Sequence, residues 1–179
     1  MGVRASRAGA SAALGIALAV AAAGSPGRAR AYEDQLTLGL GLGYAVVVTN
    51  GLPPHGALAE LSASVGLDDT WTVRANLSYA FHPGHDPMHV GLVGAELIYM
   101  VDVLEVVPFF GLGVDAIGTL YQGAAGVDAA AHAIVGVDYL AAREWLVGLD
   151  IRPYVLLTRL STDPVYFTAS ARFSLVFDL

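Results

Sequence analysis

The fold class of this 179-residue chain follows from residues Trp71–His82, WTVRANLSYAFH, where apolar side chains stand at every second position. One set of alternate positions holds only apolar residues: Trp71, Val73, Ala75, Leu77, Tyr79 and Phe81. The set between them is mostly polar: Thr72, Arg74, Asn76, Ser78, Ala80 and His82. A period of two is the pattern of a β-strand with one apolar and one polar face. We therefore predict a strand here.

The same alternation occurs seven more times after Tyr32, with varying clarity. It is plain at the C-terminus, where Phe173, Leu175 and Phe177 alternate with Ser174. The predicted strands are residues 35–48, 57–67, 71–82, 89–101, 106–117, 128–139, 144–157 and 165–179. Short strands at regular spacing, separated by turn residues, indicate an antiparallel barrel or sandwich.

The charged side chains of these strands decide which face points inward. They lie near the middle of the strands, on the face that also carries glycines, small hydroxyl residues and one histidine. These inward candidates are Glu60, Arg74, Glu96, Asp115, His132, Asp138, Asp150, Arg152 and Arg172. The interior of an eight-stranded barrel is just wide enough for side chains to fill. The large apolar residues must then face outward, which only a lipid bilayer tolerates.

We therefore predict an all-β fold, an eight-stranded antiparallel transmembrane up-and-down β-barrel. A soluble lipocalin-like carrier would have the opposite arrangement, with its apolar face inside. A buried charge without a partner is costly, so we expect the inward charges to form one connected network that closes the lumen. The alternative is a narrow polar pathway, a porin-like channel for ions or small solutes.

Outward-facing aromatic residues also indicate a membrane. With both termini in the periplasm, they fall near the two membrane interfaces, as in aromatic girdles. The predicted girdle residues are Trp71, Tyr79, Phe81, Tyr99, Tyr139, Trp145, Phe167 and Phe177. The connections agree with this orientation. Short ones lie on the periplasmic side, at residues 68–69, 102–105 and 141–143, and longer ones on the opposite side, at residues 49–56, 82–88, 118–127 and 158–164.

The first 31 residues have the composition of a secretory signal peptide. Arg4 and Arg7 precede an apolar run over residues 8–23, and Ala29-Arg30-Ala31 offers a small-x-small cleavage site before Tyr32. Cleavage after Ala23 is an alternative. We predict a signal peptide at residues 1–31 and one barrel domain at residues 32–179.

Composition excludes several other classes of protein. The chain has no cysteine, which rules out a disulfide scaffold and a thiolate metal site. After residue 31 there are 16 acids against five arginines, a net charge of −11. A basic face for nucleic acid is therefore absent.

From residue 32 to residue 179 the chain resembles the eight-stranded outer-membrane β-barrels of Gram-negative bacteria, the OmpA-, OmpX- and OmpW-like barrels. Its last seven residues, from Phe173 to Leu179, resemble the terminal strand that the barrel-assembly machinery reads, although the family usually ends in an aromatic residue. The resemblance implies a cofactor-free monomer in the lipid bilayer of the outer membrane, with a structural or surface-interaction role.

Two chemical hypotheses remain beside this one. Imidazole and carboxylate groups gather in and beside the first two outer loops and can bind zinc, copper or nickel, although the loop chemistry also explains an ordinary turn. The candidate metal ligands are His55, His82, His85, Asp86 and His89. An outer-membrane lipid-modifying enzyme is the second alternative to a structural role, but the chain carries no hydrolase, zinc-protease or phosphate-loop motif, so we predict no catalytic residues.

Overall fold

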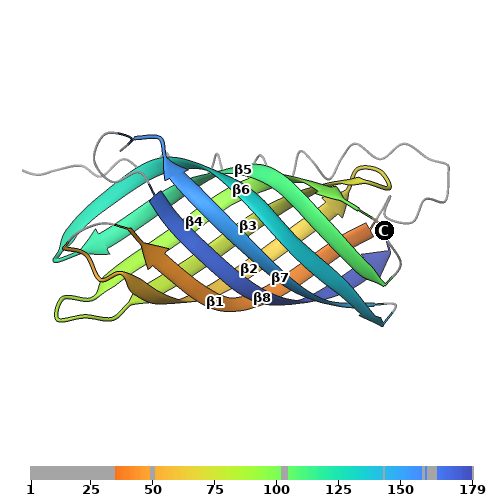
Figure 1. The fold of residues 1–179 in the computed structure, drawn as a ribbon, viewed down its shortest axis with the longest axis horizontal. Helices are drawn as coiled ribbons and strands as arrows, with labels where there is room; N and C mark the ends of the chain where they lie inside the picture. The colour runs from red at the N-terminus through yellow and green to blue at the C-terminus, as the bar shows by residue number, and fades with distance from the viewer. Residues whose placement is uncertain are drawn as a thin grey trace, which may run out of the picture.

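The computed structural model describes residues 35–48, 51–101, 105–142, 144–158, 160 and 165–178. They form eight strands that close into a barrel in chain order, each antiparallel to its neighbours (Figure 1). The strands are β1 (Gln35–Val47), β2 (His55–Gly66), β3 (Trp71–His82), β4 (Met88–Met100), β5 (Val106–Tyr121), β6 (Ala124–Ala142), β7 (Trp145–Leu156) and β8 (Val165–Asp178). The predicted all-β, eight-stranded antiparallel barrel is confirmed.

The barrel closes through the pairing of β1 with β8. Gln35 pairs with Asp178 at one end of this pair, and Val47 pairs with Tyr166 at the other. We call the end where β1 begins and β8 finishes the terminus end, and the opposite end the loop end; the terminus end lies at the right in Figure 1. Full closure leaves no unpaired strand edge around the barrel wall, as a sheet in lipid requires.

Alternation along each strand places apolar side chains outside and polar ones inside. On β3, Leu77 is 55% exposed, whereas its neighbour Asn76 is 5% exposed. On β1, Leu40 and Leu42 are exposed on the outer face, and Gly41 between them is buried. The inward and outward faces therefore follow the predicted parity.

One predicted connection is wrong. Residues 118–127 were expected to form a long outer loop, but β5 and β6 continue through most of this segment and are the longest strands. Tyr121 pairs with Ala124, so only Gln122 and Gly123 form the turn. Both have positive φ, 51° and 76°. This is the geometry of a tight hairpin turn, which needs no longer loop.

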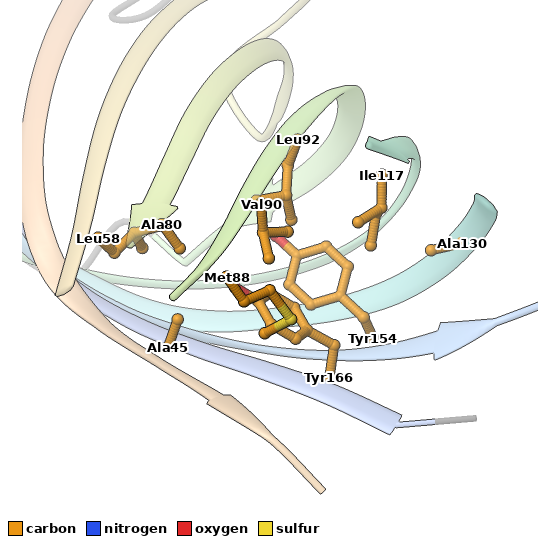
Figure 2. Close-up of a cluster of buried hydrophobic side chains, with 10 residues drawn as sticks. All are labelled: Ala45, Leu58, Ala80, Met88, Val90, Leu92, Ile117, Ala130, Tyr154 and Tyr166. Atoms are coloured by element: carbon orange, nitrogen blue, oxygen red, sulfur yellow. The ribbon is translucent and has the colours of Figure 1, made fainter. Parts of the chain in front are cut away.

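The interior is not polar along its whole length, which departs from the expectation of a polar lumen. Toward the loop end it holds an apolar cluster (Figure 2): Ala45, Leu58, Ala80, Met88, Val90, Leu92, Ile117, Ala130, Tyr154 and Tyr166. The charged residues fill the middle, and Ile98, Phe109 and Ile134 form a second, smaller cluster beyond them. We call the first group the loop-end cluster.

None of the described residues belongs to a helix long and apolar enough to span a membrane. The predicted signal peptide, residues 1–31, lies outside the described residues.

Candidate functional site

Arg152 of β7 is the centre of the inward-facing charges. Its guanidinium makes two hydrogen bonds to Glu60 of β2, Nη1 to Oε2 at 2.7 Å and Nη2 to Oε1 at 3.0 Å. Its Nε donates to Glu96 Oε1 at 2.7 Å, and its Nη1 forms an ion pair with Asp150 at 2.7 Å. Arg152 is 1% exposed. Three carboxylates therefore surround one buried guanidinium, whose fixed fork geometry suits several partners at once.

Arg172 extends this contact set toward the terminus end. Its Nη1 donates to Asp150 Oδ2 at 2.8 Å, and its Nη2 donates to Asp138 Oδ1 at 2.7 Å. Ser170 adds a hydrogen bond to Asp150 at 3.0 Å. Asp150 thus bridges Arg172 and Arg152, so the two arginines belong to one network.

His132 of β6 connects the one remaining inward acid, Asp115, to Glu96. Its Nε2 lies 3.2 Å from Glu96 Oε1, and its Nδ1 lies 2.6 Å from Asp115 Oδ2. The side chains of all three residues are completely buried. The contact with Glu96 is a hydrogen bond, whereas that with Asp115 is a close approach without hydrogen-bond geometry. His132 thereby links Asp115 to the rest of the network.

Arg74 is the most weakly bound arginine of the network. Its Nη1 lies 3.6 Å from Glu96 Oε2, which is longer than a hydrogen bond. Its guanidinium carbon lies 5.1 Å from the centre of the Phe109 ring, and that of Arg172 lies 5.6 Å from the same centre. A cation over an aromatic ring is attracted by the ring quadrupole, so Phe109 stabilises both arginines from one side.

Glycines on the inward face make the room that this network occupies. A Cβ added to Gly113 of β5 would overlap the His132 ring, and one added to Gly148 of β7 would overlap the carboxylate of Asp138. On β4, a Cβ at Gly94 would overlap the Asp115 carboxylate. Each glycine therefore lies where a charged side chain of a neighbouring strand crosses the narrow lumen.

The structure thus places all nine predicted inward residues in the interior and links them in one chain of contacts. Sequence reasoning missed three contributors: Asn76, which donates to Glu96 at 2.9 Å, Ser170 and Phe109. Asn76 and Ser170 lie on the predicted polar face, and strand parity was enough to find them. Phe109 had no such signal, because β5 carries apolar residues on both faces.

The predicted metal ligands do not come together. His55 and His89 face outward and contact the hydroxyls of Tyr44 and Tyr79 at 2.5 and 2.6 Å. His82, at the end of β3, faces inward: its Nδ1 donates to the Pro53 carbonyl at 3.1 Å, and its Nε2 accepts from the Tyr166 hydroxyl at 3.3 Å.

The two other candidate ligands are also apart from these. Asp86 accepts a hydrogen bond from Gln122 at 2.7 Å, and His85 is exposed in the loop. In the part of the chain that the structure describes, no three histidine or acidic side chains are grouped to hold a metal ion. Opposite strand parity separates His82 from His55 and His89, so the metal hypothesis has no support in this geometry.

The predicted girdle aromatics all lie on the outward face, exposed or half-exposed. At the terminus end, Tyr99 of β4 contacts Trp71 of β3 and Phe110 of β5, with ring centres 5.1 and 5.3 Å away. Trp145 and Phe173 form a further pair at 5.0 Å. Phe110 and Phe173 were not among the predicted girdle residues.

Comparison with known proteins identifies the architecture. No protein-family model and no curated protein sequence matches the chain. Solved structures do: the outer membrane protein OprG of Pseudomonas aeruginosa, with TM-score 0.65 and 10% identity, covers 84% of this chain and 99% of its own. Neisserial surface protein A, with TM-score 0.62 and 12% identity, covers 81% of this chain and 96% of its own.

A third similar structure is Ail, the attachment invasion locus protein of Yersinia pestis, with TM-score 0.56 and 11% identity. It covers 81% of this chain and 99% of its own. At such low sequence identity, these similarities are evidence for the fold alone. The charged interior and apolar exterior agree with the predicted location in a bacterial outer membrane. The chain therefore has the fold of the eight-stranded outer-membrane β-barrels, as the resemblance predicted.

Proposed function

We propose that this protein is a small outer-membrane barrel with a closed lumen, which acts through its loop-end surface and does not conduct solutes. The observation that carries this proposal is the layer of Glu60, Glu96, Asp150 and Arg152 across the middle of the barrel. These four side chains are each at most 1% exposed. Solvent therefore does not reach them from either end.

The loop-end cluster adds a second barrier on the other side of this layer. Leu92, Tyr154 and Tyr166 are each at most 4% exposed. The cavity among the residues of this half, which include Met88 and Ile117, has a volume of about 60 Å³. That is the space of one or two water molecules. Ion passage would require both barriers to open.

We assign the partner surface to the loop end, because its loops and turns face neither the lipid nor the lumen. The β5–β6 hairpin tip contacts two other loops. Gln122 hydrogen-bonds Asp86 of the neighbouring β3–β4 loop, and the Tyr121 hydroxyl reaches across the mouth of the barrel and donates to the Gly51 carbonyl of the β1–β2 loop at 3.4 Å. Apolar side chains remain exposed on this hairpin, with Leu120 46% and Val127 78% exposed. Loops and turns on a rigid scaffold commonly carry recognition, so we place the partner surface here.

The predicted contact with the barrel-assembly machinery also belongs to the proposal. β8 keeps its alternation to Asp178, with Phe173, Leu175 and Phe177 outward. Leu179 lies outside the described residues. This outward row of apolar side chains is consistent with a terminal strand read during insertion into the membrane.

Conductance of the purified barrel tests the closed lumen. In planar lipid bilayers we expect no discrete current steps from folded protein, with folding checked by the shift in gel mobility between unheated and boiled samples. Regular steps in the folded preparation would contradict the closed lumen and support the narrow-channel alternative.

Labelling with a membrane-impermeant maleimide on intact cells tests the surface role. The chain has no cysteine, so single cysteines give a clean background. We expect labelling of Gln122→Cys at the loop end and none of the matched control Asp69→Cys at the terminus end. Labelling of Asp69→Cys alone would reverse the proposed orientation.

A further inference from the structure

A cavity at the terminus end of the lumen is not used by the closed-barrel function. It has a volume of about 260 Å³ and lies between the charged network and the strand ends. Most of its polar lining consists of hydroxyl groups and arginines: Thr37, Ser62, Ser64, Thr72, Ser174, Arg74 and Arg172. We call it the terminus-end cavity. Gln35, Thr37 and Val176 in its lining are half-exposed, so water reaches it from that end.

Arg74 lines this cavity and has an unpaired hydrogen-bond donor. Arg152 contacts three carboxylates and Arg172 contacts two, with each of these ion pairs at 2.7 or 2.8 Å. Arg74 has one carboxylate at 3.6 Å, and its Nη1 has no hydrogen-bond partner although the residue is only 5% exposed. A buried charged donor without a partner is destabilising, so this guanidinium favours an acceptor in the cavity.

Hydroxyl residues neighbour Arg74 on one side in the sheet, and Glu96 of β4 is its partner on the other side. Ser64 of β2 pairs directly with Arg74 of β3, and Thr37 of β1 pairs directly with Ser64. All three side chains line the cavity. Adjacent hydroxyl donors and a guanidinium in one row are the groups that bind oxyanions.

The acids of the network do not oppose an anion here as strongly as their number suggests. Asp138 is the one carboxylate in the cavity lining among the described residues, and its Oδ1 already accepts from Arg172 at 2.7 Å. Glu60, Glu96 and Asp150 are each bound to Arg152, and none of the three lines the cavity. Glu96 uses Oε1 for this contact, and its Oε2 lies 3.6 Å from Arg74 without a hydrogen-bond partner. A solute entering from the terminus end therefore meets Arg74 and Arg172 before these three acids.

We propose that the terminus-end cavity binds a small soluble oxyanion, such as phosphate or a short carboxylate, with Arg74 as the principal ligand and Ser64 and Thr37 as hydroxyl donors. The charged layer and the loop-end cluster close the lumen beyond it. The site is thus a blind pocket reached from the terminus end, where the anion binds reversibly and does not pass through the barrel.

Calorimetric titration of the refolded barrel in detergent micelles tests this site. Sodium phosphate and sodium acetate are the probes, in chloride buffer of constant ionic strength. We expect saturable binding of at least one probe with one site per chain. Arg74→Gln should weaken it at least tenfold, Arg74→Lys less, and the control Tyr166→Phe, in the other half of the lumen, should leave it unchanged.

Two results would overturn the proposal. One is the absence of saturable heat with both probes, which would mean that water alone fills the cavity. The other is unchanged affinity in folded Arg74→Gln. If Arg74→Gln does not fold, Ser64→Ala decides: severalfold weaker binding supports the site, and unchanged binding contradicts it. Because conductance is measured separately, failure here does not affect the closed-barrel proposal.

Discussion

The two halves of the barrel interior are filled by side chains of different chemistry, one half charged and the other apolar. In the middle, toward the terminus end, Arg152, Arg172 and His132 hold five carboxylates in one network. Toward the loop end, Leu92, Tyr154 and their neighbours pack as an ordinary apolar core (Figure 2). Both fill the narrow lumen of the same sheet. The difference lies in what happens when one member is removed.

In the charged half, the contribution of each side chain to the free energy of unfolding depends on its ion-pair partners. Removing a cation leaves buried carboxylates without compensation, whereas removing an apolar side chain leaves a cavity. The charged half is therefore expected to be the more sensitive to single substitutions, and the loop-end cluster to respond in proportion to lost volume. Free energies of unfolding, from urea titrations of the barrel in phospholipid vesicles, test this comparison.

The largest effect is expected for Arg152→Met. This change keeps much of the side-chain volume but leaves Glu60, Glu96 and Asp150 without their shared cation. We expect a loss of about 3–5 kcal/mol in the free energy of unfolding. The exposed turn charge in Asp69→Asn is the control, with a change within about 0.5 kcal/mol. If both variants unfold at the same urea concentration, the network does not stabilise the barrel.

An intermediate effect is expected for Leu92→Ala in the loop-end cluster. Leu92 is 1% exposed and packs inside the lumen, so its truncation should cost about 2–5 kcal/mol, depending on how far the cluster closes around the cavity. Leu97 on the same strand faces outward and is 46% exposed. Lipid chains fill the space in Leu97→Ala, so its loss should be smaller. A larger loss for Leu97→Ala would contradict the inward and outward assignment.

The smallest effect is expected for Tyr166→Phe. The change removes the hydroxyl that lies 3.3 Å from His82 Nε2 and keeps the buried ring. A single hydrogen bond of this kind contributes about 0.5–1.5 kcal/mol. A loss greater than that of Leu92→Ala would show that polar contacts hold the loop-end half, which would remove the contrast between the two halves.

Strand β4 shows why sequence reasoning recovered one half of the interior and missed the other. Near the terminus end, Glu96 stands between Ala95 and Leu97, so a charge alternates with apolar residues and the inward face is evident. Near the loop end, Val90 and Leu92 face inward while Val93 on the opposite face is also apolar. Both faces of the strand are apolar there, so alternation does not distinguish the inward face from the outward one. The apolar interior at the loop end is evident only from the closed barrel.

The turn between β5 and β6 was missed for a related reason. The glycines and small residues of 118–127 are typical of loops, and Gln122-Gly123 is not the Asn-Gly or Asp-Gly pair that marks a tight hairpin. Pairing with β4 up to Tyr121 extends β5 past the predicted boundary. Neighbouring strands, and not local residue preference, set that length.

Alternation of side chains by itself determined the eight strands, the direction of each face and the identity of the inward charges, because a strand places every second side chain on the same side of the sheet. The tertiary structure decided which charges meet. Glu60 and Arg152 are 92 residues apart in the chain, and no local pattern relates them. The register of a closed barrel brings them within hydrogen-bonding distance across the lumen and places Arg74 beside a hydroxyl-lined cavity.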